Sequence, residues 1–361
     1  NSGIELLQAL ENNNELKVVC FIDDDKDKKG RVLYGKKIYS PNDLDFLANK
    51  RNISYLLLAM PNITNNQRRE IIKQVTKYNF SVRTLPSLVD IAKGKIRANN
   101  LVELEIDDLL GRQKVLPDQD LMKKNITSKI VLVTGAGGSI GSQLCREILK
   151  INPKKLLILD SNEFALYSIL NELNLINNNF VEIIPLLASV QDKENIKIIL
   201  STWRPQTIYH AAAYKHVPIV EHNLIEGVKN NVFGTLVIAK SALEIGTSDF
   251  VFISTDKAVR PTNIMGATKR LGEICLQSLF DNKKENQCTK FSMVRFGNVL
   301  DSSGSVIPKF RQQINERKPL TLTHPEITRF FMTITEAAEL VIQAGAMSFG
   351  DFSFRTKGNN E

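Results

Sequence analysis

The segment VLVTGAGGSIGSQL, residues 131–144, limits the folds open to this chain more than any other stretch. Its glycines Gly135, Gly138 and Gly141 stand three residues apart, between an apolar run typical of a strand and an amphipathic run typical of a helix. A tight strand-to-helix turn favours glycine, and backbone N–H groups at the start of the helix can face a pyrophosphate. The segment therefore predicts a dinucleotide-binding turn. A glycine turn in a sheet without a ligand is the alternative.

An acidic residue ends the strand that is predicted next along the chain. This residue, Asp160, opens the segment DSNE, which has no Arg placed to receive a 2′-phosphate. A carboxylate at this position can accept hydrogen bonds from the ribose hydroxyls of adenosine. The pattern therefore predicts NAD as the cofactor in preference to NADP.

Six apolar runs separated by helical patterns indicate the sheet to which this turn belongs. The predicted strands are residues 129–135, 155–160, 181–188, 207–213, 249–255 and 291–298. Strands that alternate with helices form a doubly wound parallel sheet, which binds its ligands at the carboxyl ends of the strands. We therefore expect an NAD-binding catalytic domain over residues 129–361, of the α/β class.

The first 91 residues predict a second, smaller α/β domain of Rossmann-like type. Strands are expected at residues 16–23, 53–60 and 81–86 and a helix at 65–80, and their alternation predicts a parallel sheet. The opening NSGIELLQAL looks like the end of a glycine-rich turn entering a helix. We therefore expect this domain to be truncated at its start, with residues 92–128 as a connector to the catalytic domain.

Composition narrows the possible partners. The formal charge of +8, from 47 basic and 39 acidic side chains, suits a solvated basic surface or attraction to an anionic substrate or membrane face. No tight Lys/Arg run with interleaved aromatics is present, so nucleic acid is not an expected partner. The four cysteines form no CxxC pair and no histidine stands at metal-ligand spacing, which predicts reduced thiols and no metal. No apolar run reaches the ~18 residues of a membrane span.

The segment STDKAVRPTNIMGATKR, residues 254–270, poses the main question about activity. Short-chain dehydrogenases carry a Tyr and a Lys four residues apart on one helix, where the Lys lowers the pKa of the Tyr. Here Met265 and Lys269 keep that spacing, and a thioether has no proton to exchange. The chain is therefore either an inactive relative or an enzyme that moves protons with other residues.

The motif blocks of the second domain resemble one known group of enzymes. The GxxGxxG spacing, HAAAYKHVP (210–218) and NNVFGT (230–235) resemble the extended short-chain dehydrogenase/reductase superfamily. TDKAVRPTNIMGATKR, FGNVLDSSGSVIPKF and THPEITRFFMTITEA closely resemble the large bacterial UDP-N-acetylglucosamine 4,6-dehydratases of the PglF, WbpM and CapD type. The resemblance covers about 107–345 and is closest to the enzyme of the bacillosamine pathway of protein N-glycosylation. In this family Met in place of Tyr is the usual pattern, which favours an active enzyme.

The resemblance implies an activity. The family oxidises C4 of UDP-N-acetylglucosamine with bound NAD, removes water across C5 and C6, and returns the hydride to C6. The product is UDP-2-acetamido-2,6-dideoxy-hexos-4-ulose. Its members carry an amino-terminal membrane anchor and often form homo-oligomers. A full-length protein at the cytoplasmic face of the inner membrane is implied, with this chain soluble.

The resemblance also assigns roles around the segment 255–257. Asp256 would protonate the departing C6 hydroxyl, which requires a pKa raised by burial, and Lys257 would take the C5 proton, which requires a lowered pKa. Thr255 would hydrogen-bond the C4 oxygen, and Lys269 would hold the nicotinamide ribose. The acceptor of the C4 hydroxyl proton stays open among Asp256, Thr255 through a water, and Tyr214.

Binding residues carry over from the same blocks. The implied cofactor contacts are Gly135, Gly138, Ser139, Ile140, Gly141, Asp160, Ser189, Ala211, Ala212, Ala213 and Lys269. Asn298 and Ser305 would bind the nucleotide sugar, and His216 and Pro218 would border the hexose. The candidates for the diphosphate or uridine, which are otherwise surface residues, are Arg260, Lys309 and Arg329.

Two other kinds of protein compete with this interpretation. A 4-epimerase or a C5-inverting dehydratase would use the same fold, but those enzymes usually keep the Tyr that Met265 replaces. A NAD-sensing regulatory protein without chemistry would explain Met265 but not the Thr255-Asp256-Lys257 group. Bound NAD cannot separate these alternatives, whereas turnover can.

Overall fold

The structure is a computed structural model. It describes residues 2–11, 17–50, 53, 55–60, 65–75, 77–78, 81–84, 102–103, 116–178, 181–282, 288–300, 302, 304–322, 324, 326 and 329–347. The chain divides into two compact units, Asn1–Gln113 and Lys114–Glu361, and each is described by itself. Most of the predicted connector at 92–128 lies outside the described residues, and the predicted domain boundaries stay predictions.

The first unit contains two three-stranded sheets. Its elements are α1 (Ser2–Glu11), β1 (Phe21–Ile22), β2 (Val32–Leu33), β3 (Lys36–Tyr39), η1 (Pro41–Asp43), α2 (Leu44–Lys50), β4 (Tyr55–Leu58), α3 (Asn65–Val75), β5 (Ser81–Thr84) and β6 (Val102–Glu103). The strand orders are β1-β3-β2 and β4-β5-β6. The pairs β1–β3 and β4–β5 are parallel, and the pairs β2–β3 and β5–β6 are antiparallel.

This arrangement differs from the single parallel sheet that the sequence predicts. The missed element is the hairpin β2–β3, whose turn residues Tyr34 and Gly35 have φ values of 47° and 71°. A two-residue turn with both φ values positive matches the right-handed twist of its strands. The short strands gave no alternating pattern from which to predict it.

The second unit is built on one six-stranded sheet. Its strands are β7 (Ile130–Thr134), β8 (Lys155–Asp160), β9 (Glu182–Leu187), β10 (Thr207–His210), β11 (Asp249–Thr255) and β12 (Lys290–Phe296). The order is β12-β11-β10-β7-β8-β9 and every neighbouring pair is parallel. This confirms the predicted doubly wound sheet. The strand order reverses between β7 and β10, which is where such folds bind ligands.

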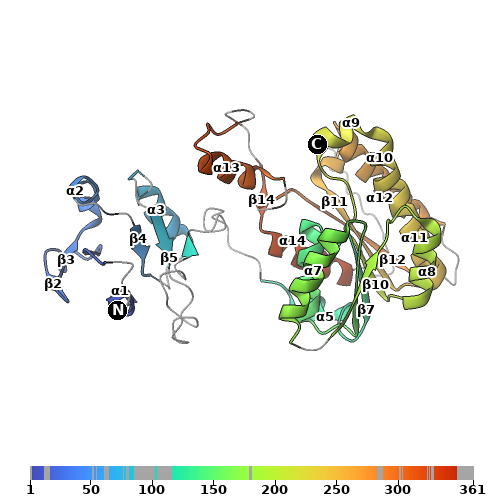
Figure 1. Ribbon diagram of the computed structural model, residues 1–361, viewed down its shortest axis with the longest axis horizontal. Coiled ribbons are helices and arrows are strands. Elements are labelled where there is room, and N and C mark those ends of the chain that lie inside the picture. Colours follow the sequence, from blue (N-terminus) through green and yellow to red (C-terminus); the bar gives the residue numbers. More distant parts are fainter. Residues whose placement is uncertain are drawn as a thin grey trace, which may run out of the picture. The chain divides into compact units, whose positions relative to one another are not determined.

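Helices cover both faces of this sheet (Figure 1). One core contains residues of α5 (Gln119–Lys124), α6 (Ser139–Lys150), α7 (Glu163–Ile176) and α14 (Ile334–Ala346). The other contains residues of α8 (Lys193–Trp203), α11 (Thr235–Ile245) and α12 (Ile264–Asp281). Along β7, Val131 and Val133 belong to the first core and Leu132 to the second, as the alternation of strand side chains requires.

The remaining elements lie in the connections of the second unit. They are α9 (Val217–His222), α10 (Leu224–Val228), the π-helix η4 (Lys229–Gly234), η5 (Asp256–Ala258), β13 (Asn298–Val299), α13 (Val306–Asn315) and β14 (Phe331–Met332). β13 and β14 pair in parallel.

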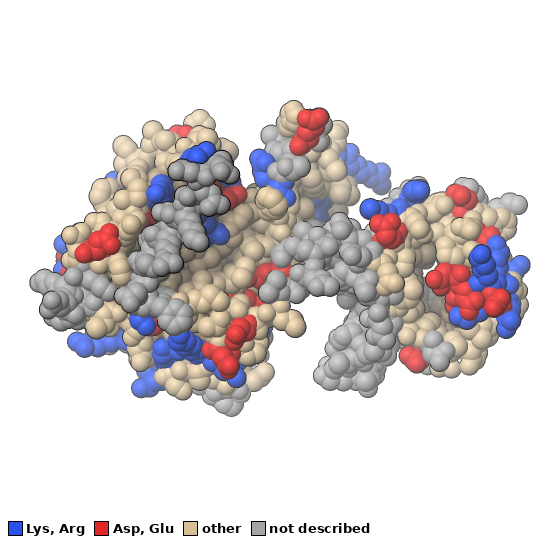
Figure 2. Space-filling model, turned by 180° about the vertical axis from the view of Figure 1, so that it is seen from behind, with Lys and Arg blue, Asp and Glu red and all other residues tan. Residues whose placement is uncertain are grey.

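Within the described ranges, no helix has both the length and the apolar character needed to cross a membrane. On the face shown in Figure 2, basic and acidic side chains are interspersed.

Candidate active site

The glycine turn between β7 and α6 is closed by direct backbone packing. Gly135 has φ +67°, and a Cβ on it would lie 2.7 Å from the Ala212 backbone. A Cβ on Gly141 would lie 1.9 Å from the Gly135 carbonyl oxygen, and Gly138 caps α6 without a side chain. The turn therefore admits only glycine at Gly135 and Gly141, and it leads directly into the first turn of α6, where the backbone N–H groups of a helix start can face an anionic ligand.

Asp160, at the end of β8, holds this turn in place. Its Oδ2 accepts a hydrogen bond from Gly137 N at 2.9 Å, and its Oδ1 accepts one from Asn162 N at 2.9 Å. Each carboxylate oxygen has a second lone pair that can accept from a ribose hydroxyl. Ser189 follows β9 and accepts a hydrogen bond from Gln191 N at 3.2 Å.

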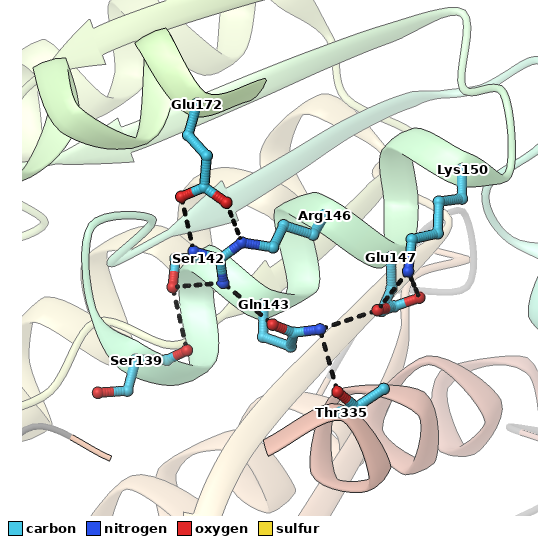
Figure 3. Close-up of polar contacts among 8 residues, drawn as sticks. All are labelled: Ser139, Ser142, Gln143, Arg146, Glu147, Lys150, Glu172 and Thr335. Atoms are coloured by element: carbon cyan, nitrogen blue, oxygen red, sulfur yellow. Dashed lines mark hydrogen bonds and ion pairs between the residues drawn. The ribbon is translucent and has the colours of Figure 1, made fainter. Parts of the chain in front are cut away.

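A polar network fixes α6 against its neighbours (Figure 3). Arg146 donates to both carboxylate oxygens of Glu172 on α7. Gln143 donates to Glu147 at 2.8 Å and to Thr335 on α14 at 3.3 Å. The helix whose first turn would face a pyrophosphate is therefore tied to elements on either side of it.

At the switch point, a buried histidine joins β7 to the second helical layer. Thr235 donates to the Asn231 carbonyl at 2.7 Å, so it must accept from His210 Nε2 at 3.0 Å. His210 Nδ1 then accepts from the Thr134 hydroxyl at 2.7 Å. Burial, with the charge of Lys269, lowers the pKa of His210 to about 3, so the ring is neutral. Ala211 N donates to the Thr134 carbonyl, which sets the small Ala211–Ala213 segment beside the glycine turn.

Asn231 is a functional candidate that sequence reasoning left without a role. It lies in the π-helix η4, is fully buried, and its side chain bonds both the N–H and the carbonyl of Tyr214, at 2.8 and 3.0 Å. It also donates to Thr268 on α12 at 3.0 Å. π-Helical turns are frequent at functional sites. The signal was present in NNVFGT, although a π-turn has no sequence signature of its own.

The Thr255-Asp256-Lys257 group forms a single turn at the carboxyl end of β11. Thr255 caps η5 and donates to Asp256 Oδ1 at 2.9 Å. Lys257 Nζ lies 3.0 Å from the same oxygen and 3.5 Å from Asn298 Oδ1 on β13. The side chains of Asp256 and Lys257 are 51% and 36% exposed. A carboxylate and the amine nitrogen of a lysine therefore stand together at the ligand-binding edge, open to a substrate.

The prediction that burial raises the pKa of Asp256 is wrong for this structure. Partial burial acts to raise the pKa, but the hydrogen bonds from Lys257 and Thr255 outweigh it and the pKa lies below the usual value. The reason is that Asp256 remains half exposed while two donors stabilise its charged form.

Helix α12 places Met265 and Lys269 directly behind this turn. Both are buried, and Lys269 Nζ lies 4.0 Å from the centroid of the Phe252 ring. Burial lowers the pKa of Lys269 to about 7, and Glu273 partly opposes this. A Cβ on Gly266 would lie 2.2 Å from the Lys257 carbonyl oxygen, so the helix and the turn at 255–257 touch backbone to backbone.

On the expected substrate side, the structure brings some of the named residues together. A Cβ on Gly304 would lie 2.3 Å from His216 Cε1, so the His216 ring packs on the loop that precedes α13. Ser305 caps α13, and its buried hydroxyl has no hydrogen-bond partner among the described residues. Asn298 N donates to the Phe330 carbonyl at 3.1 Å.

The other substrate candidates are less closely tied to this group. Pro218 lies in the first turn of α9, Lys309 lies on α13, and Arg329 directly precedes Phe330. Arg260 has φ 45° in the connection from η5 to α12. For Pro218, Arg260 and Lys309, the described part of the chain shows no hydrogen bond or ion pair to Asp256 or Lys257.

The residues around the glycine turn suit a dinucleotide. A turn packed too closely for a Cβ, a helix start with its backbone N–H groups and a carboxylate at the end of the next strand together match its pyrophosphate and ribose. Among the residues that the structure describes, no cluster of three or more His, Cys, Asp or Glu could hold a metal ion.

Comparisons with known proteins agree with this architecture. Residues 131–358 match the family described as polysaccharide biosynthesis protein. The chain is 42% identical to the capsular polysaccharide biosynthesis protein CapD of Staphylococcus aureus, over 96% of this chain and 58% of that protein. It is 32% identical to a UDP-N-acetylglucosamine 4,6-dehydratase (inverting) of Campylobacter jejuni subsp. jejuni, over 59% of this chain and 62% of the relative.

Solved structures give the same picture. The X-ray structure of Pen from Bacillus thuringiensis matches with a TM-score of 0.58 and 33% identity, over 62% of this chain and 67% of that one. The chain spans 58% and 55% of the lengths of two curated relatives, CapD and the probable polysaccharide biosynthesis protein EpsC of Bacillus subtilis.

Proposed function

The chain belongs to the polysaccharide biosynthesis protein family, and from this premise we propose that it is an NAD-dependent UDP-N-acetylglucosamine 4,6-dehydratase. The observation that carries the proposal is the turn Thr255-Asp256-Lys257, which holds a carboxylate oxygen and an amine nitrogen 3.0 Å apart at the carboxyl edge of the parallel sheet. The 32% identical relative named as a UDP-N-acetylglucosamine 4,6-dehydratase supports the substrate.

The cofactor would lie across the glycine turn. Backbone N–H groups at the start of α6 would hold its pyrophosphate, Asp160 would bind the adenosine ribose, and Lys269 would bind the nicotinamide ribose. Bound NAD would supply the chemistry of accepting a hydride from C4 and returning it to C6. The fixed position of α6 and the packed glycine turn favour a cofactor that stays bound through the cycle.

The lowered pKa of Asp256 supports one of the three candidates for the acceptor of the C4 hydroxyl proton. Because Asp256 starts as a carboxylate, it can take this proton as C4 becomes a ketone. The ketone makes the C5 hydrogen acidic, and Lys257 removes it as a neutral amine, becoming an ammonium group. Asp256 then gives its proton to the C6 hydroxyl, which leaves as water, and Lys257 returns a proton to C5 as the hydride reaches C6. The balance is the loss of one water.

Met265 fits this scheme because the scheme assigns no proton transfer to residue 265. It is 5% exposed on the first turn of α12, next to the backbone contact between Gly266 and Lys257. We assign it a packing role beside the catalytic turn. The chemistry that a Tyr performs in other members of the fold would pass to Asp256 and Lys257.

Family membership supports a place in glycoconjugate synthesis. The resemblance of the motif blocks suggests that the product leads to a bacillosamine-type sugar. Attachment of a longer protein to a membrane and assembly into homo-oligomers stay predictions.

Mass spectrometry in deuterated water tests the proposed function. The protein is mixed with UDP-N-acetylglucosamine, and we expect loss of one water from the sugar nucleotide with one deuterium gained at C5. Substrate that keeps its mass, while the protein retains NAD, would favour the regulatory alternative. Inversion of the configuration at C4 without loss of water would favour an epimerase. NMR of the dehydrated product would give the configuration at C5.

A further inference from the structure

Phe330 is an aromatic side chain that the described part of the fold leaves exposed to solvent. It is 94% exposed, more than any other large apolar residue that the structure describes. Its backbone is nevertheless fixed, because its carbonyl accepts Asn298 N at 3.1 Å and the next residues pair with β13. An exposed ring on a fixed backbone is available for contact with a ligand.

Phe330 Cβ and the carboxylate of the proposed acid lie near the same glycine, Gly297. A Cβ on Gly297 would lie 3.9 Å from Phe330 Cβ, 3.1 Å from the Phe330 carbonyl oxygen and 3.7 Å from Asp256 Oδ2. Phe330 Cβ and the Asp256 carboxylate thus both lie close to the position that a side chain at residue 297 would occupy. A ligand seated over Gly297 would bring the Phe330 side chain and the carboxylate under one cover.

The chemistry needs such a cover. Asp256 is half exposed, and the charged group that contacts it is Lys257 on its own turn; the facing elements present Gly297, Asn298 and the Phe330 carbonyl, with Arg329 next along the chain. In this state its pKa lies below the usual value. A carboxylate that must hold a proton between two steps gains from exclusion of water, since burial favours the neutral form.

We propose that Phe330 is a positioning residue that covers the Asp256 carboxyl and keeps water from it while the hexose of a nucleotide sugar is bound. The inference rests on the proposed function. It adds a residue from the far end of the catalytic unit to the chemistry of the turn at 255–257. Its apolar bulk matters for this role, whereas its aromatic character does not.

The kinetic test compares Phe330→Ala, Phe330→Leu and a control, Leu175→Ala, which removes an apolar side chain that is 85% exposed on α7. We expect Phe330→Ala to lower kcat about tenfold, part of the ~10²–10⁴ that a well-placed acid or base contributes, with a smaller change in KM. Phe330→Leu should keep most of the activity, and Leu175→Ala should behave as wild type. Wild-type kcat in Phe330→Ala, or an equal loss in Phe330→Leu, would overturn the inference.

Proton uptake gives a readout that a purely structural role would not move. UDP-N-acetylglucosamine is titrated into Lys257→Ala, in which turnover is blocked, by calorimetry at pH 5 in buffers of different ionisation enthalpy. We expect proton uptake on binding, and its loss when Phe330→Ala is added or when Asp256→Asn removes the carboxyl. Uptake that persists without Phe330 contradicts the inference. Turnover by the wild type keeps the proposed function intact in that case, whereas a wild type without turnover would overturn both.

Discussion

Replacing Gly266 by Ala should damage catalysis far more than stability. Gly266 lies in the first turn of α12, against the backbone of the turn at 255–257. A Cβ at this position would lie 2.2 Å from the Lys257 carbonyl oxygen and 3.0 Å from its carbonyl carbon. Neither atom belongs to a flexible side chain, so the clash must be relieved by moving the backbone that carries the proposed base.

The size of the effect follows from that distance. Real Cβ contacts essentially never fall below 3.0 Å, so the 2.2 Å contact requires a displacement of about 1 Å. A misplacement of that size can cost about 10²-fold in rate, which corresponds to about 2.7 kcal/mol in the barrier. Alanine favours a helix over glycine by about 1 kcal/mol, which offsets part of the strain in the folded state.

The assay is kcat for the loss of water from UDP-N-acetylglucosamine, with NAD content and thermal unfolding measured on the same samples. Gly3→Ala on α1 is the matched control, because its Cβ would meet the Phe21 ring at an ordinary 3.7 Å. We expect the control to behave as wild type and Gly266→Ala to lose about 10²-fold in kcat with NAD retained. A Gly266→Ala protein with wild-type kcat would refute the reasoning that this backbone contact positions Lys257.

Three further predictions concern single side chains. Lys257→Ala should abolish dehydration while NAD stays bound, and unchanged turnover would remove Lys257 as the base. Because the pKa of Lys269 is about 7 in the fold and 10.5 as its ordinary value, the unfolded chain binds more protons between these pH values, and stability rises with pH across that window. Lys269→Met should remove this pH dependence and stabilise the protein at pH 7 by up to about 4 kcal/mol. The free energy of unfolding is measured with urea at pH 7 and pH 9, and an equal change between the two pH values in wild type and variant would contradict the prediction. His210 has a pKa of about 3 in the fold against an ordinary 6.5. Its contribution to stability is therefore complete above pH 6.5 and is lost as the pH falls from 6.5 towards 3. NMR should show its ring neutral at pH 5, and a midpoint near 6.5 would disprove the buried geometry.

Most of the fold of the second unit could be predicted from short sequence patterns. The six strands of the large sheet follow from apolar runs, and the turn at Gly135 follows from a steric need that only glycine meets. Both are properties of short segments, so sequence alone could reveal them. The hairpin at 32–39 was missed because its strands are too short to alternate visibly.

The site was less accessible to sequence reasoning because its properties depend on contacts between segments. The pKa of Asp256 is set by donors and exposure that no motif records, and its direction was therefore wrong. Asn231 acts through a π-turn that brings it to Tyr214 and Thr268. The roles of Arg260, Lys309 and Arg329 stay predictions, since they would act on a substrate and not on each other.

The position of α14 has a consequence for how the protein is made. Ala338, Val341 and Ile342 on this helix share a core with Val131 and Val133 of β7, and Asn125 donates to the Gly345 carbonyl at 2.9 Å. About 200 residues separate the two ends of this contact, which at roughly 5–20 residues per second takes about 10–40 s to synthesise. During that time one face of the central strands lacks its last cover. The apolar surface of the nascent chain is therefore open to aggregation until α14 has been synthesised. We expect chaperone binding to the nascent chain during this interval.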